Sequence, residues 1–81
     1  MNKEILTKQL LYRSIHRGCK ETDFLIGEFA KVKLAEIEDL EMFNRFIEED
    51  DMLIYDWILG KDEVPKRYEA LIKNIREFHK I

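Results

Sequence analysis

The stretch SIHRGCKETD, residues 14–23, decides how the chain is divided, because it places polar residues and a glycine between two apolar segments. Before it, apolar side chains recur at helical spacing through residues 3–17. Gly18 then favours a helix end, since glycine readily adopts the left-handed conformation that closes many helices. Glu21 and Asp23 follow in the first turn of a second predicted helix, where acidic side chains suit the helix dipole. The stretch therefore predicts a corner between two helices.

Apolar periodicity predicts five helices in all. Beyond the first, apolar side chains keep helical spacing in residues 20–34, 37–49 and 65–79, and between Asp51 and Gly60. Asp50 or Asp51 is expected to cap the fourth helix, and Gly60 to end it. Pro65 suits the first turn of the fifth helix. We therefore expect an all-α fold, a small five-helix bundle with mostly antiparallel neighbours, unless the corner at Gly18 crosses its two helices at a wide angle.

The length of 81 residues predicts a single domain spanning residues 1–81. A domain of this size buries only about 60% of the surface that its unfolded chain exposes, which leaves room for a core but little for a deep substrate cavity. The composition, 46% apolar and 38% charged, is typical of a folded protein rather than a disordered one.

Charge, cysteine content and hydropathy argue against several classes of protein. The net charge of −3 disfavours nucleic-acid binding, which usually needs a basic surface. The one cysteine, Cys19, cannot form an internal disulfide and fits a reducing compartment. No apolar run approaches the roughly 20 residues of a membrane span, so we expect no membrane insertion, and the amino terminus lacks the apolar core of a secretory signal. A cytoplasmic protein of bacterial type is the expected class.

Candidate ligands and nucleophiles do not form a recognisable reactive site. Zinc usually needs four ligands at short spacing, whereas the candidates here are scattered: His16, Cys19, Glu21, Asp23 and His79. A predicted helix end lies between His16 and Cys19, which disfavours a catalytic pair. The acidic run of residues 48–51 is expected to form a helix end, a turn and a new cap. We therefore predict no catalytic residue and no metal site, and the sequence shows no glycine-rich phosphate loop that would hold a nucleotide cofactor.

Most aromatic residues are expected in the core because they fall at helical spacing: Phe24, Phe29, Phe43, Phe46 and Phe78. Gly27 lies inside the second predicted helix, where glycine costs up to about 1 kcal/mol relative to alanine, so we expect another backbone or a bulky ring to approach it closely. Tyr55 and Trp57 lie two positions apart on one helix and cannot both point fully inward. One of them is therefore a candidate anchor for a partner.

Recognition of a partner is what remains for the polar corner. Arg17, Gly18 and Glu21 would place a guanidinium, bare backbone and a carboxylate side by side, a surface that can dock a protein through charge-assisted hydrogen bonds. Arg17 and Glu21 can instead form an intramolecular ion pair that braces the corner, and exposed pairs contribute only about 0–1 kcal/mol. The residues alone favour neither interpretation.

The segment YRSIHRGCKETDFLIGEF, residues 12–29, resembles the motif of the succinate dehydrogenase FAD-assembly factor family. These are the SdhE-like proteins, whose mitochondrial members are called succinate dehydrogenase assembly factor 2. The matching residues are Arg17, Gly18, Glu21 and Asp23. The segment DDMLIYDWILG, residues 50–60, resembles the second block of the family through Asp50 or Asp51, Tyr55 and Trp57. The resemblance covers nearly the whole chain, although His16 departs from the basic residue that many members carry at its position.

The resemblance implies an assembly factor, or dedicated chaperone, rather than an enzyme. Family members bind the flavoprotein subunit of succinate dehydrogenase, or in some bacteria fumarate reductase, and promote covalent attachment of FAD to a histidine of that client. The implied partner-binding residues are His16, Arg17, Gly18, Glu21, Asp23, Tyr55 and Trp57. We expect a monomer that leaves FAD on the client, with a direct contact to FAD left open. The alternative is a small helical interaction module with another client, for example a regulatory or antitoxin-like protein.

Overall fold

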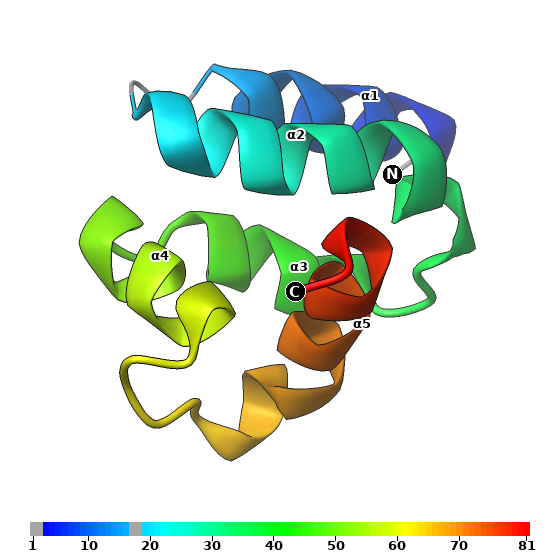
Figure 1. Cartoon of the computed structure of the whole chain (residues 1–81). Coiled ribbons are helices and arrows are strands. Elements are labelled where there is room, and N and C mark those ends of the chain that lie inside the picture. Colours follow the sequence, from blue (N-terminus) through cyan, green and yellow to red (C-terminus); the bar gives the residue numbers. More distant parts are fainter. Residues whose placement is uncertain (1–2, 17–18) are drawn as a thin grey trace.

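The computed structural model describes residues 3–16 and 19–81, and within them the chain forms α-helices and short 3-10 helices without a strand (Figure 1). The α-helices are α1 (Lys3–Ile15), α2 (Lys20–Lys33), α3 (Leu40–Ile47), α4 (Asp51–Leu59) and α5 (Glu69–His79), and the 3-10 helices are η1 (Leu34–Glu36) and η2 (Lys66–Tyr68). The prediction of an all-α fold with five helices is confirmed. The predicted helix end at Gly18 lies outside the described residues.

The helices lie in two groups. Figure 1 shows α1 and α2 side by side and running in opposite directions, above a second group formed by α3, α4 and α5. The first two helices therefore form an antiparallel pair rather than a wide crossing. The Cα radius of gyration is 11.7 Å, close to the roughly 12 Å expected for a globular chain of this length. Every helix among the described residues is too short or too polar to span a membrane.

One hydrophobic core joins the two groups, and every α-helix contributes to it. Its fully buried members include Leu10 of α1, Ile26 of α2, Phe43 and Phe46 of α3, Ile54 and Ile58 of α4, and Ile75 of α5. Burying a side chain of this kind stabilises the fold by about 1.5–3 kcal/mol. These contacts hold the helices in place, and so they also fix the positions of the polar residues that project from them.

At Gly27, α1 packs closely on α2. A Cβ atom at this position would lie 3.3 Å from Ile15 Cγ1 and 3.6 Å from the Ile15 Cα atom. Glycine therefore lets the end of α1 approach the α2 backbone, which offsets its cost in a helix interior. The prediction of a close backbone approach at Gly27 is confirmed.

The third helix is shorter than the apolar pattern predicts. It begins at Leu40 rather than at residue 37, because the Asp39 side chain caps it by accepting a hydrogen bond from Met42 N at 3.0 Å. Ile37 has an extended backbone, with φ −77° and ψ 122°, and its side chain packs partly buried against the core. An apolar side chain can thus continue a helical pattern in sequence while lying outside the helix.

The two ends of α4 follow the sequence prediction. The Asp50 side chain accepts a hydrogen bond from Met52 N at 2.8 Å, which makes Asp50 the N-cap. Gly60 closes the helix in the left-handed conformation, with φ +76°. The fifth predicted helix starts differently, because Pro65 precedes the 3-10 turn of η2 and α5 begins only at Glu69.

One aromatic residue that was expected in the core lies on the surface. Phe24 is 59% exposed, because the inward face of α2 carries Leu25 and Ile26 and residue 24 projects from the opposite side. The core prediction is therefore wrong for Phe24. It is confirmed for the buried residues Phe29, Phe43 and Phe46, while Phe78 packs partly buried against the core.

Candidate partner-binding site

The first turn of α2 carries two of the predicted partner-binding residues. Glu21 is exposed and Asp23 is half-buried. The helix begins at Lys20. Cys19, the residue before it, has an extended backbone with φ −115° and ψ 118°. The Asp23 amide donates a hydrogen bond to the Cys19 carbonyl oxygen at 2.8 Å. Both carboxylates therefore stand near the positive end of the α2 dipole, as predicted.

The other two motif residues of the corner, Arg17 and Gly18, lie outside the described residues. The proposed docking surface and the alternative ion pair with Glu21 therefore both remain predictions. What the structure describes beside Glu21 is the thiol of Cys19, whose Sγ atom lies 3.5 Å from Glu21 Oε2 and can donate a hydrogen bond to the carboxylate.

Thr22 is the buried residue of this turn, with 0% of its surface exposed. Its Oγ1 atom lies 3.2 Å from the Cys19 carbonyl oxygen and 3.2 Å from Asp51 Oδ1 at the start of α4. A threonine hydroxyl carries one hydrogen, which these two acceptors share. The first turns of α2 and α4 therefore lie against each other.

Residues 48–51, which we call the acidic turn, run from the end of α3 into the first residue of α4, and their side chains contact four different elements. The contacts join Glu48 Oε1 to Arg13 Nη2 of α1 (3.4 Å), Glu49 Oε2 to the Tyr68 hydroxyl of η2 (2.9 Å), Asp50 Oδ1 to Met52 N of α4 (2.8 Å) and Asp51 Oδ1 to Thr22 Oγ1 of α2 (3.2 Å). The predicted helix end, turn and cap are confirmed. Within residues 3–16 and 19–81, no three His, Cys, Asp or Glu side chains gather as metal ligands would.

Tyr68 anchors the far side of the acidic turn. Its ring is buried against Phe46, with centroids 5.2 Å apart, and against Trp57, with centroids 5.6 Å apart. Burial is the main cause that raises the pKa of the Tyr68 phenol above its ordinary value of 10.0. The hydrogen bond to Glu49 also raises this pKa, whereas the neighbouring Arg67 guanidinium acts against it. At neutral pH the phenol is therefore protonated and donates to Glu49.

Tyr55 and Trp57, from the second motif block, have different surroundings. Trp57 is only 5% exposed and packs between Phe46 and Tyr68. Tyr55 is half-buried, and Lys61 Nζ lies 5.9 Å from its ring centroid. The expectation that only one of the two points fully inward is confirmed. Trp57 is placed to support the acidic turn from beneath, and Tyr55 is the one that a partner can reach.

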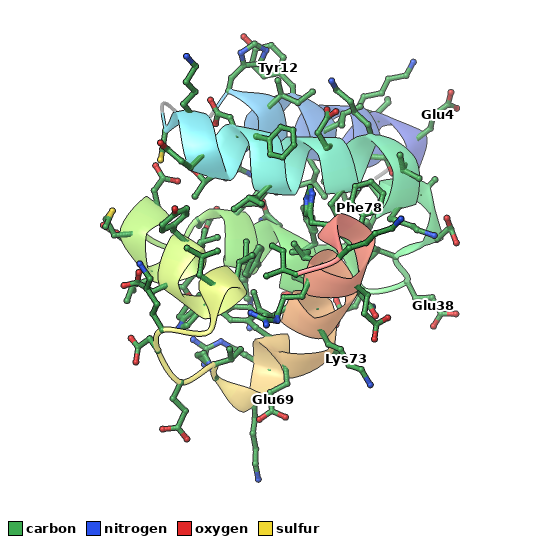
Figure 2. All side chains as sticks on the ribbon, in the orientation of Figure 1. Glu4, Tyr12, Glu38, Glu69, Lys73 and Phe78 are labelled. Carbon is green, nitrogen blue, oxygen red and sulfur yellow. The ribbon has the colours of Figure 1, made fainter. Side chains whose placement is uncertain are left out.

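His16 lies just beyond α1 and is exposed. Its ring centroid is 4.3 Å from that of Tyr12, with the two planes tilted by 38°. Figure 2 shows Tyr12 on the outer side of α1. A depression of about 250 Å³ lies beside this aromatic pair and is also lined by Arg13 and Ile47. His16 is therefore accessible, and Tyr12 joins it as a surface residue that was not predicted.

Phe24 is the second surface residue that the site prediction missed. It lies three positions beyond Glu21, so both side chains project from the same side of α2. Its ring centroid is 5.4 Å from that of His79, and His79 Nε2 lies 2.7 Å from the Leu25 carbonyl oxygen, which accepts a hydrogen bond. The position of residue 24 opposite the inward face of the helix is the sequence signal that could have identified it.

A larger depression, of about 740 Å³, lies at the other end of α2. Its lining includes the apolar side chains of Phe29, Met42 and Phe78, and acidic residues such as Glu38. Figure 2 shows Glu38 pointing outward at this end of the molecule. The depression is lined by none of the predicted partner-binding residues that the structure describes.

Comparison with known proteins finds related sequences across most of the chain. Residues 8–79 match the family described as flavinator of succinate dehydrogenase. The FAD assembly factor SdhE of Coxiella burnetii is 32% identical over 80 residues, which cover 95% of this chain and 96% of that protein. The mitochondrial succinate dehydrogenase assembly factor 2 of Dictyostelium discoideum is 35% identical over 78 residues, which cover 94% of this chain and 55% of that protein.

The same mitochondrial factor of Yarrowia lipolytica is 33% identical over 76 residues, covering 85% of this chain and 52% of that protein. The chain thus spans about half the length of these mitochondrial relatives and nearly all of the bacterial one. No solved structure matches it.

Proposed function

The chain belongs to the family of succinate dehydrogenase flavinators, and we propose that it is an assembly factor that promotes covalent attachment of FAD to the flavoprotein subunit of succinate dehydrogenase. The observation that carries this proposal is the match to a bacterial FAD assembly factor over nearly the full length of both proteins. The proposed role is that of a chaperone, because the relatives are named for assembly rather than for a reaction.

The client meets the first turn of α2. Glu21 offers an exposed carboxylate, which can accept charge-assisted hydrogen bonds from a guanidinium or from backbone amides of the client. Phe24 adds an exposed ring on the same side of the helix, and exposed aromatic side chains are frequent anchors of protein interfaces. Arg17 and Gly18 join this surface on the strength of the family motif alone.

Residues of the neighbouring helices extend the surface. Tyr55 contributes the reachable ring of α4, and His16 contributes an exposed ring at the end of α1. Asp23 is half-buried, so it adds a polar contact at the edge and favours the first turn of α2 through the helix dipole. Trp57 acts from beneath, by packing, rather than by contact with the client.

The chain acts by holding the client in one arrangement. A factor that binds one conformation of a client more tightly than the others shifts the population toward that conformation. Holding the reacting groups in alignment then lowers the entropic part of the activation barrier. The bond-making chemistry belongs to the client and its flavin, and the side chains described here bind and orient. We therefore expect Cys19→Ala to retain activity.

Flavin fluorescence of the client subunit in a denaturing gel tests this function, because only covalently bound flavin survives denaturation. The client expressed with the chain is expected to fluoresce, and the client expressed alone to fluoresce weakly. Glu21→Gln is expected to lower the signal about tenfold, the loss of one charge-assisted interaction. Glu41→Gln is the control, since Glu41 is exposed on α3 and paired with Arg45. Equal fluorescence with and without the chain would reject the proposal.

The family motif also supports a more detailed proposal about which client the chain binds, in which compartment and in which oligomeric state. The flavoprotein subunit of succinate dehydrogenase is the first client and that of fumarate reductase the second. The chain works as a cytoplasmic monomer without nucleic acid or a bound cofactor. A pull-down from native extract separates this from the alternative interaction module: the flavoprotein subunit should dominate, and a different dominant protein would favour the alternative.

A further inference from the structure

Thr22 is a residue of the α2 first turn whose role the proposed function leaves unexplained. It stands between Glu21 and Asp23, yet it is fully buried. Its hydroxyl reaches Asp51 Oδ1 at 3.2 Å, across 29 positions of sequence. Asp51 is half-buried, and a hydroxyl that donates to a carboxylate forms a charge-assisted hydrogen bond, which partial burial strengthens relative to one in bulk water.

Asp51 is itself held in place by its neighbours in the acidic turn. Asp50 caps α4 through Met52 N at 2.8 Å, and Glu49 accepts the hydrogen bond of the Tyr68 hydroxyl at 2.9 Å. Asp51 lies in the first turn of α4, where its charge suits the helix dipole. The carboxylate that receives Thr22 therefore belongs to a fixed part of the fold.

The start of α2 differs from the starts of α3 and α4 in its capping. Cys19 makes no side-chain capping hydrogen bond, whereas Asp39 and Asp50 each accept one from their own helix. What the α2 start has instead is a tie to its surroundings, because the Thr22 hydroxyl donates to the Cys19 carbonyl oxygen and to the Asp51 carboxylate. The direction in which this turn presents Glu21 therefore depends on the Thr22 hydroxyl.

We propose that Thr22 and Asp51 are positioning residues for client binding. Their hydrogen bond holds the first turn of α2 on the first turn of α4, so that Glu21 and Tyr55 meet the client as one rigid surface. Preorganised surfaces bind more tightly because less conformational freedom is lost on association. Neither residue needs to touch the client, and the inference rests on the proposed function.

Thr22→Val tests the proposal, because valine nearly keeps the shape of threonine and removes the hydroxyl. The affinity for the flavoprotein subunit is expected to fall about tenfold, the effect of losing one hydrogen bond to a charged group. Thr22→Ser keeps the hydroxyl and is expected to bind within about twofold of the wild type.

Ser14→Ala is the matched control. Ser14 is also fully buried, but its hydroxyl donates to the Leu10 carbonyl oxygen at 2.7 Å within its own helix. The control variant is expected to keep the wild-type affinity even where its melting temperature falls. Wild-type affinity in Thr22→Val, or an equal loss of affinity in Ser14→Ala, would overturn the proposal.

Hydrogen exchange on the free chain tests the same hydrogen bond without the client. Thr22→Val is expected to speed exchange of the Asp23 amide about tenfold while amides of α5 keep their wild-type rates. Unchanged exchange at Asp23 would overturn the inference even if the client binds normally. If exchange changes as expected but the wild-type chain binds no flavoprotein subunit, the proposed function fails and the positioning role fails with it, while the hydrogen bond stands.

Discussion

The two ends of α2 are built in opposite ways. At its start, a buried hydroxyl and the acidic turn join neighbouring elements through side-chain hydrogen bonds. At its end, the helix gives way to η1 beside an open depression of about 740 Å³, lined by apolar side chains such as Phe29 and Phe78. The start carries motif residues that the structure describes, and the depression is lined by none of them.

The larger depression and the described motif residues thus lie at opposite ends of α2. A hollow suits a small molecule, whereas a protein partner needs side chains held in fixed directions over a broad area. In α2 the acidic turn supplies that rigidity at one end only. The larger depression is therefore not the feature that the proposed function uses, and three substitutions test this contrast.

Phe29→Ala is expected to have the largest effect, and the effect is on stability. Phe29 is 3% exposed and its ring meets that of Phe78 edge to face, with centroids 5.7 Å apart. Truncating a buried phenylalanine costs about 3–5 kcal/mol of unfolding free energy, which urea denaturation measures. The affinity of the folded protein for the flavoprotein subunit is expected to stay unchanged. A loss of affinity larger than the fraction of unfolded protein explains would show that the end of α2 near the depression also takes part in binding.

Phe24→Ala is expected to have the next largest effect, and the effect is on binding. The folded chain should lose about tenfold in affinity, because an exposed aromatic anchor is removed. Val32→Ala is the matched control: Val32 is 56% exposed on the same helix, against 59% for Phe24, but lies near the other end. Titration calorimetry should show no loss for the control. Equal losses would mean that the client covers the whole outer face of α2.

Tyr68→Phe is expected to have the smallest effect and sharpens the account of the braced end. Loss of the hydrogen bond to Glu49 should lower the unfolding free energy by about 1 kcal/mol at neutral pH. In the wild type, the folded phenol keeps its proton above the ordinary pKa of 10.0 while the unfolded phenol loses it. Stability from this group is therefore full below pH 10.0 and falls as pH rises beyond it.

Urea denaturation between about pH 8 and 11 measures this dependence. The variant should lack the part of the decline that Tyr68 causes, whereas Tyr12→Phe should retain it because Tyr12 is 65% exposed. If Tyr68→Phe and the wild type lose stability in parallel above pH 10.0, the buried phenol does not govern the dependence.

Much of the fold could be predicted from the sequence, because helices leave a local record. Apolar spacing predicted the helices, and the capping chemistry of Asp50 and Gly60 predicted both ends of α4. The predictions that failed had assumed that an apolar residue at helical spacing lies within a helix and faces the core. Ile37 continues an apolar pattern but precedes the cap of α3, and Phe24 is apolar but lies opposite the inward face of α2.

Less of the candidate site could be predicted, because its supports are not local. Acidic residues in the first turn of α2 followed from the helix dipole, and Glu21 is exposed as its proposed role requires. The contact between Thr22 and Asp51 joins residues 29 positions apart, and that between Glu49 and Tyr68 joins residues 19 apart. Such pairs depend on how the helices pack, which spacing within one helix does not reveal.

The contact between His79 and the Leu25 carbonyl oxygen spans 54 positions and so bears on how the protein is made. During synthesis α2 emerges long before α5. The part of its apolar face that packs on α5 therefore stays uncovered until the end of this sequence has been translated. Completion of the core is therefore a late event, after most of this sequence has been translated. Until then, α3 packs on α1 and α4 packs on α2, and these contacts reduce the apolar surface through which the nascent chain could aggregate.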